Sequence, residues 1–250
     1  REATLSLHWM IDPNRIPAYA EAVAPSRKRK KAREGAIQIR NGAFALAGLD
    51  FQNEISDWVG DLVSFSLLEP DGPDGPMGWV IALNSKDEQG AKLFLQRFWQ
   101  TRSLAGAELQ INSYRGIGLI SGKNPLLGSI PKPLATALID DDLVLLASNK
   151  GVLEQALDSS QLSTQNQLGD IELQRTIPLL GEGIALLTAS PSAMNSWLGI
   201  PTAITNRKDI GRLIASFKPA GRNLLLEGLL QFKEPISQVS LASKEGTALL

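Results

Sequence analysis

Two short stretches of alternating apolar residues, at 63–67 and 79–83, flank the turn-rich loop EPDGPDGP at 69–76. Alternation with a period of two places every second side chain on one face of a strand, and a loop rich in proline, glycine and aspartate reverses the chain. The sequence therefore predicts a β-hairpin here, which limits the fold more than any other feature. A pair of weaker strands is predicted at 107–113 with 116–120. Further hairpins are predicted at 134–139 with 143–147, through the three aspartates at 140–142, and at 210–218 with 223–232, around PAGR at 219–222.

Helical segments are interleaved with these hairpins. A predicted strand at 4–10 is followed by Asp12-Pro13, and a predicted strand at 183–190 leads into Ser190-Pro191. A capping side chain followed by proline at the first helical position is typical of a helix start. A doubly wound parallel sheet would require regular alternation of strand and helix, which the hairpins interrupt. We therefore expect an α+β fold with a mainly antiparallel sheet and helices packed on one face.

The same order of elements occurs twice along the chain. A strand, a proline-initiated helix, a Trp-x-Gly motif (58–60 and 197–199) and a hairpin follow one another in both halves. We interpret this as a degenerate internal repeat. Residues 1–182 are predicted to form a first α+β unit, and 183–250 the start of a second, truncated copy packed on the first.

The segment DWVGD at 57–61 joins a predicted helix to a predicted strand. Asp50 is expected to cap that helix, in which the apolar residues at 51, 55 and 58 share one face. Gly60 stands where a left-handed residue typically ends a helix. We interpret the segment as the end of a helix rather than as a working site.

The charge and residue content exclude several classes of function. The 250 residues include 25 Lys and Arg and 26 Asp and Glu, a net charge of −1, whereas nucleic-acid binders are usually basic. We therefore expect no nucleic-acid partner. The absence of cysteine excludes disulfides, thiolate metal sites and cysteine nucleophiles. No run of 18 apolar residues is present, so no segment of this sequence is expected to span a bilayer.

A basic run, RKRKKAR at 27–33, is the most unusual feature of the sequence. It lies at the predicted start of a helix, where positive charge opposes the helix macrodipole, so helix stability does not explain it. Two interpretations stay open: a solvated helix end, or a surface that contacts anionic lipid headgroups or a partner. The candidate contact residues are Arg27, Lys28, Arg29, Lys30, Lys31 and Arg33.

Two features invite a catalytic or metal-binding interpretation. His8, the single histidine, lies on the polar face of the first predicted strand. A Ser-His-Asp triad would need the fold to bring a nucleophile and a carboxylate to it, so we expect a surface or hydrogen-bonded structural histidine. Asp140, Asp141 and Asp142 do not have the spacing of an EF-hand loop, and we expect them at a solvated hairpin tip.

Three glycines give a weaker candidate for a binding site. Gly116, Gly118 and Gly122 superficially resemble a phosphate-binding loop, but no GKS or GKT triplet follows, so turn or close-packing roles are expected.

Glu54, Asp57 and Asp61 lie close together in the sequence, and a hydrolase with a carboxylate pair is the least favoured alternative because only the fold sets their separation. We expect no catalytic, cofactor-binding or metal-binding residues, no cofactor, and a protein that is not an enzyme.

Several segments, in the same order over roughly residues 1–200, carry a resemblance to a known family: LHWMIDPNRIPAYAEAVAP, SRKRKKAR, GLDFQNEISDWVGDLVSFSL, GWVIAL, KDEQGAKLFLQRFWQ, INSYRGIGLISG and LIDDDLVLLASNKGVLEQALD. Together they resemble the largely cyanobacterial family named domain of unknown function three-three-five-two. The resemblance implies a membrane-anchored protein with a large extracytoplasmic part. The chain begins at Arg1, so we expect the anchoring segment to be missing from it and the domain to lie in the periplasm or thylakoid lumen.

The sequence as a whole favours binding over catalysis. We expect a non-enzymatic extracytoplasmic domain that binds or scaffolds proteins, with a membrane surface or membrane-protein complex as its partner. A carrier of a lipid or other apolar ligand is the alternative, because a sheet covered by helices can enclose a pocket. A large apolar cavity would favour the carrier, and an exposed apolar patch over a filled core would favour the binding domain.

Overall fold

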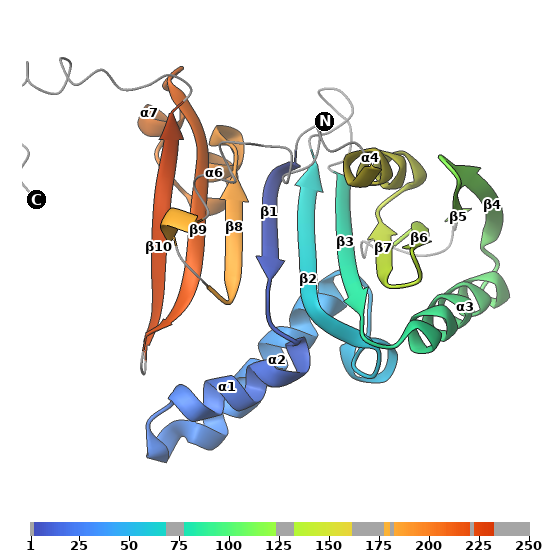
Figure 1. Ribbon diagram of the computed structural model, residues 1–250, viewed down its shortest axis with the longest axis horizontal. Coiled ribbons are helices and arrows are strands. Elements are labelled where there is room, and N and C mark those ends of the chain that lie inside the picture. The colour runs from blue at the N-terminus through green and yellow to red at the C-terminus, as the bar shows by residue number, and fades with distance from the viewer. Residues whose placement is uncertain are drawn as a thin grey trace, which may run out of the picture.

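A computed structural model describes residues 3–68, 78–123, 133–161, 178–180, 183–220 and 223–232. Within these residues ten strands form one sheet in the order β10-β9-β8-β1-β2-β3-β7-β6-β5-β4 (Figure 1). Every neighbouring pair is antiparallel. The strands are β1 (Ala3–Trp9), β2 (Val59–Leu68), β3 (Gly78–Ser85), β4 (Glu108–Tyr114), β5 (Ile117–Lys123), β6 (Ala135–Ile139), β7 (Leu143–Ala147), β8 (Ala185–Ala189), β9 (Ile210–Ala220) and β10 (Asn223–Phe232).

Helices connect these strands and cover the sheet. They are η1 (Pro13–Arg15), α1 (Ile16–Val23), η2 (Ser26–Lys28), α2 (Arg29–Leu46), η3 (Phe51–Ile55), α3 (Glu88–Leu104), α4 (Lys150–Gln161), α6 (Pro191–Leu198) and α7 (Thr202–Thr205). The mixture of one antiparallel sheet with helices confirms the predicted α+β class and all four predicted strand pairs.

The helices do not all lie on one face of the sheet, so that part of the prediction is wrong. In β7, Val144 and Leu146 belong to the apolar cluster that includes residues of η3 and α3. Leu145 belongs to a second cluster, which includes Leu153 of α4. Successive residues of a strand point to opposite faces, so α4 covers the face opposite α3. The cause is visible in the sequence of β7, LVLLA, whose continuous apolar run suits a strand buried on both faces.

The order of strand, helices and hairpin occurs twice among the described residues, in one unit that starts at β1 and in another that starts at β8. β1 pairs antiparallel with β8, with Leu7 opposite Leu187 at the middle of the pairing. Each of these two strands is followed by helices and then by a hairpin, β2–β3 in one case and β9–β10 in the other. Both units contribute to one sheet, and the division of the chain at residue 182 stays a prediction.

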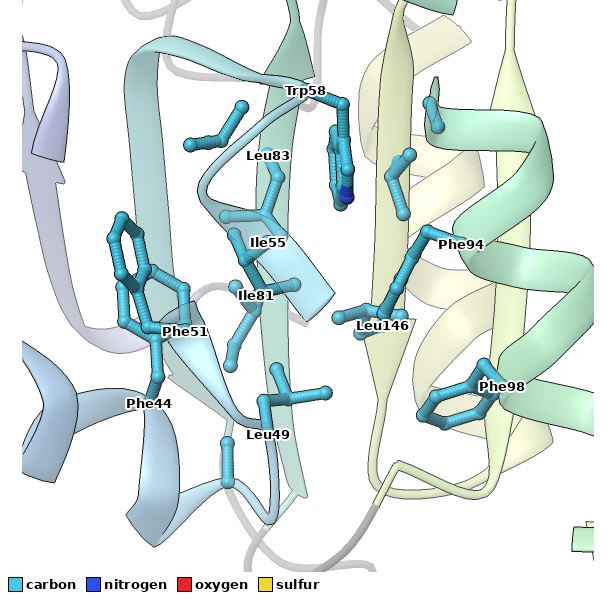
Figure 2. Packing of buried hydrophobic residues seen from close by; sticks show 14 of the residues in the cluster. Phe44, Leu49, Phe51, Ile55, Trp58, Ile81, Leu83, Phe94, Phe98 and Leu146 are labelled. Atoms are coloured by element: carbon cyan, nitrogen blue, oxygen red, sulfur yellow. The ribbon is translucent and has the colours of Figure 1, made fainter. Parts of the chain in front are cut away.

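The segment DWVGD lies in the main core. Trp58 is 3% exposed, and its indole packs against Phe94 of α3 with ring centroids 5.1 Å apart (Figure 2). The indole N–H donates a hydrogen bond to the carbonyl of Glu54 at 2.7 Å. The segment Phe51–Ile55 is a π-helix, capped by Asp50, and it carries Phe51 and Ile55 into the same core. The interpretation of DWVGD as a folding element therefore agrees with the structure.

Gly60, however, does not end a helix in the left-handed conformation. It lies within β2, where an added Cβ would be 2.7 Å from Oδ1 of Asn84. That oxygen accepts a hydrogen bond from the backbone N–H of Leu62 at 2.7 Å, so the absence of a side chain leaves room for a strand-to-strand bond. Gly199 does end a helix, with φ of 67°. The two Trp-x-Gly motifs thus use glycine for different physical reasons.

Candidate functional site

The helices α1 and α2 form a hairpin that projects beyond the lower ends of the strands (Figure 1). Pro25 separates the two helices, because α1 ends at Val23 and a short 3-10 turn, η2, starts at Ser26. The turn between the helices lies at the end of the hairpin away from the sheet (Figure 1). We call residues 24–33, which include this turn and the start of α2, the hairpin tip.

All six basic residues of the predicted contact site lie on the hairpin tip and are exposed. Arg33 contacts Glu21 of α1, with 3.1 Å between Nη1 and Oε2, and Lys30 lies 4.0 Å from Glu34. Within the described part of the chain the other four have no carboxylate partner; they are Arg27, Lys28, Arg29 and Lys31. Residues 21–34 contain six basic and two acidic side chains, whereas the whole chain has a net charge of −1. The tip is therefore positive and the rest of the molecule is negative.

The start of α2 provides no internal partner for this charge. Its first turn contains no acidic residue, and Lys28 occupies the N-cap position without a side-chain hydrogen bond. Backbone N–H groups at a helix start have no partner inside the helix, and the positive end of the macrodipole lies there. An anion placed at the tip would be stabilised by these groups and by the basic side chains together.

His8 lies on β1 and contacts a serine of the neighbouring strand β2. Its Nδ1 and Oγ of Ser64 are 2.7 Å apart, and on the same face Ser6 and Ser66 are joined by a 2.9 Å hydrogen bond. Ser64 and Ser66 lie on β2, directly opposite His8 and Ser6 on β1. The expected hydrogen-bonded structural histidine is therefore what the structure shows.

The three aspartates at 140–142 occupy the exposed turn between β6 and β7, as expected. Asp140 and Asp141 have φ of 47° and 63°, a conformation that aspartate tolerates better than most residues, and Asp141 pairs with Lys92 at 3.0 Å. Across the described ranges, no three His, Asp or Glu side chains are grouped so that they could hold a metal ion.

The remaining candidates also have local roles. Gly116 has φ of 81° in the turn between β4 and β5, and an added Cβ at Gly122 would lie 2.8 Å from the Trp99 ring, which confirms a turn role for the first and a close-packing role for the second. Gly118 has neither role, because it lies within β5 and an added Cβ there would meet no atom within 4 Å. Among the carboxylates, Glu54 accepts a hydrogen bond from the backbone N–H of Asp50 at 2.7 Å. Asp61 accepts one from the side chain of Asn84 at 3.2 Å.

Asp50 gives the clearest pH-dependent contribution in this region. Hydrogen bonds from the side chain and the backbone N–H of Asn53 lower the pKa of Asp50 below its ordinary value of 3.8. A carboxyl with a lowered folded-state pKa stabilises the fold above its unfolded pKa, and this contribution is lost as the pH falls through the folded pKa. We expect Asp50→Ala to lower the urea midpoint near neutral pH, and the difference from wild type to shrink steadily below about pH 4. A difference that is independent of pH would exclude this role of the carboxylate.

One feature was missed by the sequence interpretation. An open pocket of about 220 Å³ lies between the α1–α2 hairpin and the strands β1, β8 and β9. Its lining is mostly apolar and includes Trp9, Ile16, Tyr19, Ile39 and Phe217. These residues are up to about two hundred positions apart in the sequence, so no local pattern could have predicted the pocket.

Among the described helices, we find none that combines the length and the apolar character required to span a bilayer.

Comparison with known proteins identifies a family for this sequence. Residues 1–249 match the model of a family described as proteins of unknown function, DUF3352. The searches of curated proteins and of solved structures found no match.

Proposed function

The chain belongs to the DUF3352 family, as the resemblance in its sequence segments predicted, and from its own surface we propose that it is a non-enzymatic domain that binds an anionic membrane surface through the hairpin tip. The observation that carries the proposal is the exposed group of six basic residues on a projecting part of the fold. The two residue groups most open to a catalytic interpretation, around His8 and at 140–142, have structural partners, which supports binding rather than chemistry.

Electrostatic forces attract the hairpin tip to an anionic bilayer and orient the molecule with the tip towards it. A basic residue close to an anionic bilayer contributes about 1 kcal/mol, and the attraction falls off within a Debye length of about 10 Å at 0.1 M salt. The negative charge of the rest of the molecule opposes any approach with another side first. The projection of the hairpin brings the basic side chains to the lipid while the sheet stays away from it.

We also propose a cellular location for the domain. We place this domain on the extracytoplasmic side of a membrane, in the periplasm or thylakoid lumen, as part of a membrane-anchored protein. In that position the tip would fix the orientation of the sheet relative to the bilayer and leave its other surfaces accessible to a protein partner. This context is supported by the sequence resemblance described above.

A site-directed label tests which side of the molecule meets the membrane. The chain has no cysteine, so Ser26→Cys at the tip and Ser103→Cys on α3 each provide a single attachment point for an environment-sensitive fluorophore. Both positions are exposed, and α3 lies towards the right-hand end of the sheet in Figure 1, far from the hairpin turn at the lower left.

With vesicles that contain phosphatidylglycerol, we expect a blue shift and higher emission at residue 26 and no change at residue 103, because only the tip enters the headgroup layer. Vesicles of phosphatidylcholine alone should change neither label. Equal changes at both positions, or no change at residue 26, would overturn the proposal.

A further inference from the structure

Arg40 is a buried cation beside the open pocket. It is 6% exposed and lines the pocket together with Tyr19 and Ile39. Its guanidinium stacks on the ring of Phe51, with 4.1 Å from Cζ to the ring centroid. Burial lowers the pKa of this guanidinium, and the negative charge of Asp12 partly offsets the effect.

The hydrogen bonds of Arg40 all go to neutral oxygens within the described part of the chain. Nε and Nη2 donate to Oδ1 of Asn41 at 3.1 Å, Nη1 donates to the carbonyl of Pro13 at 3.5 Å, and Nη2 donates to Oε1 of Gln52 at 3.5 Å. A buried charge without an opposite charge in contact is costly, and a bond of 3.5 Å is at the long limit. A carboxylate could therefore replace the two long bonds with shorter, charge-assisted ones.

Tyr19 provides a second polar group in the same lining. Its hydroxyl oxygen is shielded from solvent and has no hydrogen-bond partner among the residues that the structure describes. A buried hydroxyl without a partner is destabilising, so a ligand that forms a hydrogen bond with it gains affinity. The other lining side chains are mainly aliphatic or aromatic. The pocket thus combines an apolar wall with a cation whose hydrogen bonds go to neutral oxygens and with a hydroxyl that has no partner among the described residues.

We propose that this pocket binds a single-chain amphiphile of the fatty-acid type, with its carboxylate at Arg40 and Tyr19 and its chain against Trp9 and Phe217. An apolar cavity of about 150 Å³ already binds benzene. The pocket, at about 220 Å³, is therefore suited to a medium-length chain rather than to a two-chain lipid. Ile39, which is 74% exposed and lines the pocket, becomes covered when a chain lies across it. The sequence left open a role as a carrier of a lipid or other apolar ligand, and this pocket is the place where such a ligand would bind.

A bromine-labelled fatty acid tests the proposal in solution without vesicles. Because Trp9 lines the pocket and bromine quenches indole fluorescence at short range, decanoate brominated at the chain end should quench part of the tryptophan emission in a saturable way. The Trp9→Phe variant should lose that quenching while calorimetry with unlabelled decanoate still shows binding. Quenching that persists in Trp9→Phe, or no saturable binding below the micelle-forming concentration, would overturn the proposal.

The charge requirement is tested with decanol, which has the same chain length and no charge. We expect Arg40→Gln to weaken decanoate binding about tenfold or more and to leave decanol binding unchanged, while Arg40→Lys retains a preference for decanoate. Equal losses for both ligands would remove Arg40 from the site. If Arg40→Gln fails to fold, the quenching and calorimetry of Trp9→Phe still test whether the ligand binds in this pocket.

Fatty-acid binding in the pocket and membrane binding by the hairpin tip can be refuted independently of each other. A variant with Lys28, Arg29 and Lys31 changed to glutamine should bind decanoate like wild type, because none of these residues lines the pocket. Loss of decanoate binding in that variant would contradict the placement of the ligand.

Discussion

Replacing Trp58 by alanine is expected to lower the free energy of unfolding by about 3–5 kcal/mol, as full removal of a buried tryptophan does in other cores. The indole is 3% exposed, packs against Phe94 and donates a hydrogen bond to the carbonyl of Glu54. Its removal therefore leaves a cavity between α3 and the π-helix and an unpaired carbonyl. Chemical denaturation followed by circular dichroism measures the change.

Two control variants separate packing from other effects. Trp58→Phe keeps most of the ring but loses the indole N–H, and should cost less than Trp58→Ala. Leu104→Ala removes an apolar side chain that is 84% exposed, and should change the free energy of unfolding by no more than about 0.5 kcal/mol. A loss below about 1 kcal/mol for Trp58→Ala would contradict the structural role of DWVGD.

The strand pairs and helix starts could be predicted because they depend on neighbouring residues. The side chain of Asp12 accepts a hydrogen bond from the N–H of Asn14, and the side chain of Ser190 accepts one from the N–H of Ala193, as the cap-proline pattern indicated. Short apolar segments separated by turn residues indicated the hairpins for the same local reason.

Features that depend on distant residues were not predictable in this way. The strand conformation of Gly60 follows from the side chain of Asn84 on the next strand, so the local helix-end pattern was misleading. The position of α4 on the second face depends on the burial of β7 from both sides. The continuous apolar run in β7 was the available signal for this burial.

The candidate site was predictable in its residues and not in its geometry. The basic run at 27–33 could be found in the sequence, but its place at the end of a projecting hairpin depends on how α1 and α2 leave the sheet. The pocket near Arg40 needs two helices and three strands to come together, which no local pattern describes.

Changing all six basic residues of the tip to glutamine is expected to remove binding to anionic vesicles. At about 1 kcal/mol for each residue, the loss amounts to several orders of magnitude in the partition coefficient. The fold should tolerate the change, because all six side chains are exposed and helix α2 gains nothing from positive charge at its start. The six residues are Arg27, Lys28, Arg29, Lys30, Lys31 and Arg33.

Membrane contact through the hairpin tip is tested most directly by co-sedimentation of two matched variants with phosphatidylglycerol vesicles at increasing salt. One variant changes Lys28, Arg29 and Lys31 to glutamine, and the other makes the same change at three exposed basic residues elsewhere, Arg97, Lys123 and Lys208. Both alter the net charge by the same amount. We expect the tip variant to lose most of its binding and its salt dependence, and the other to bind like wild type. Equal binding by the two variants would contradict the proposal.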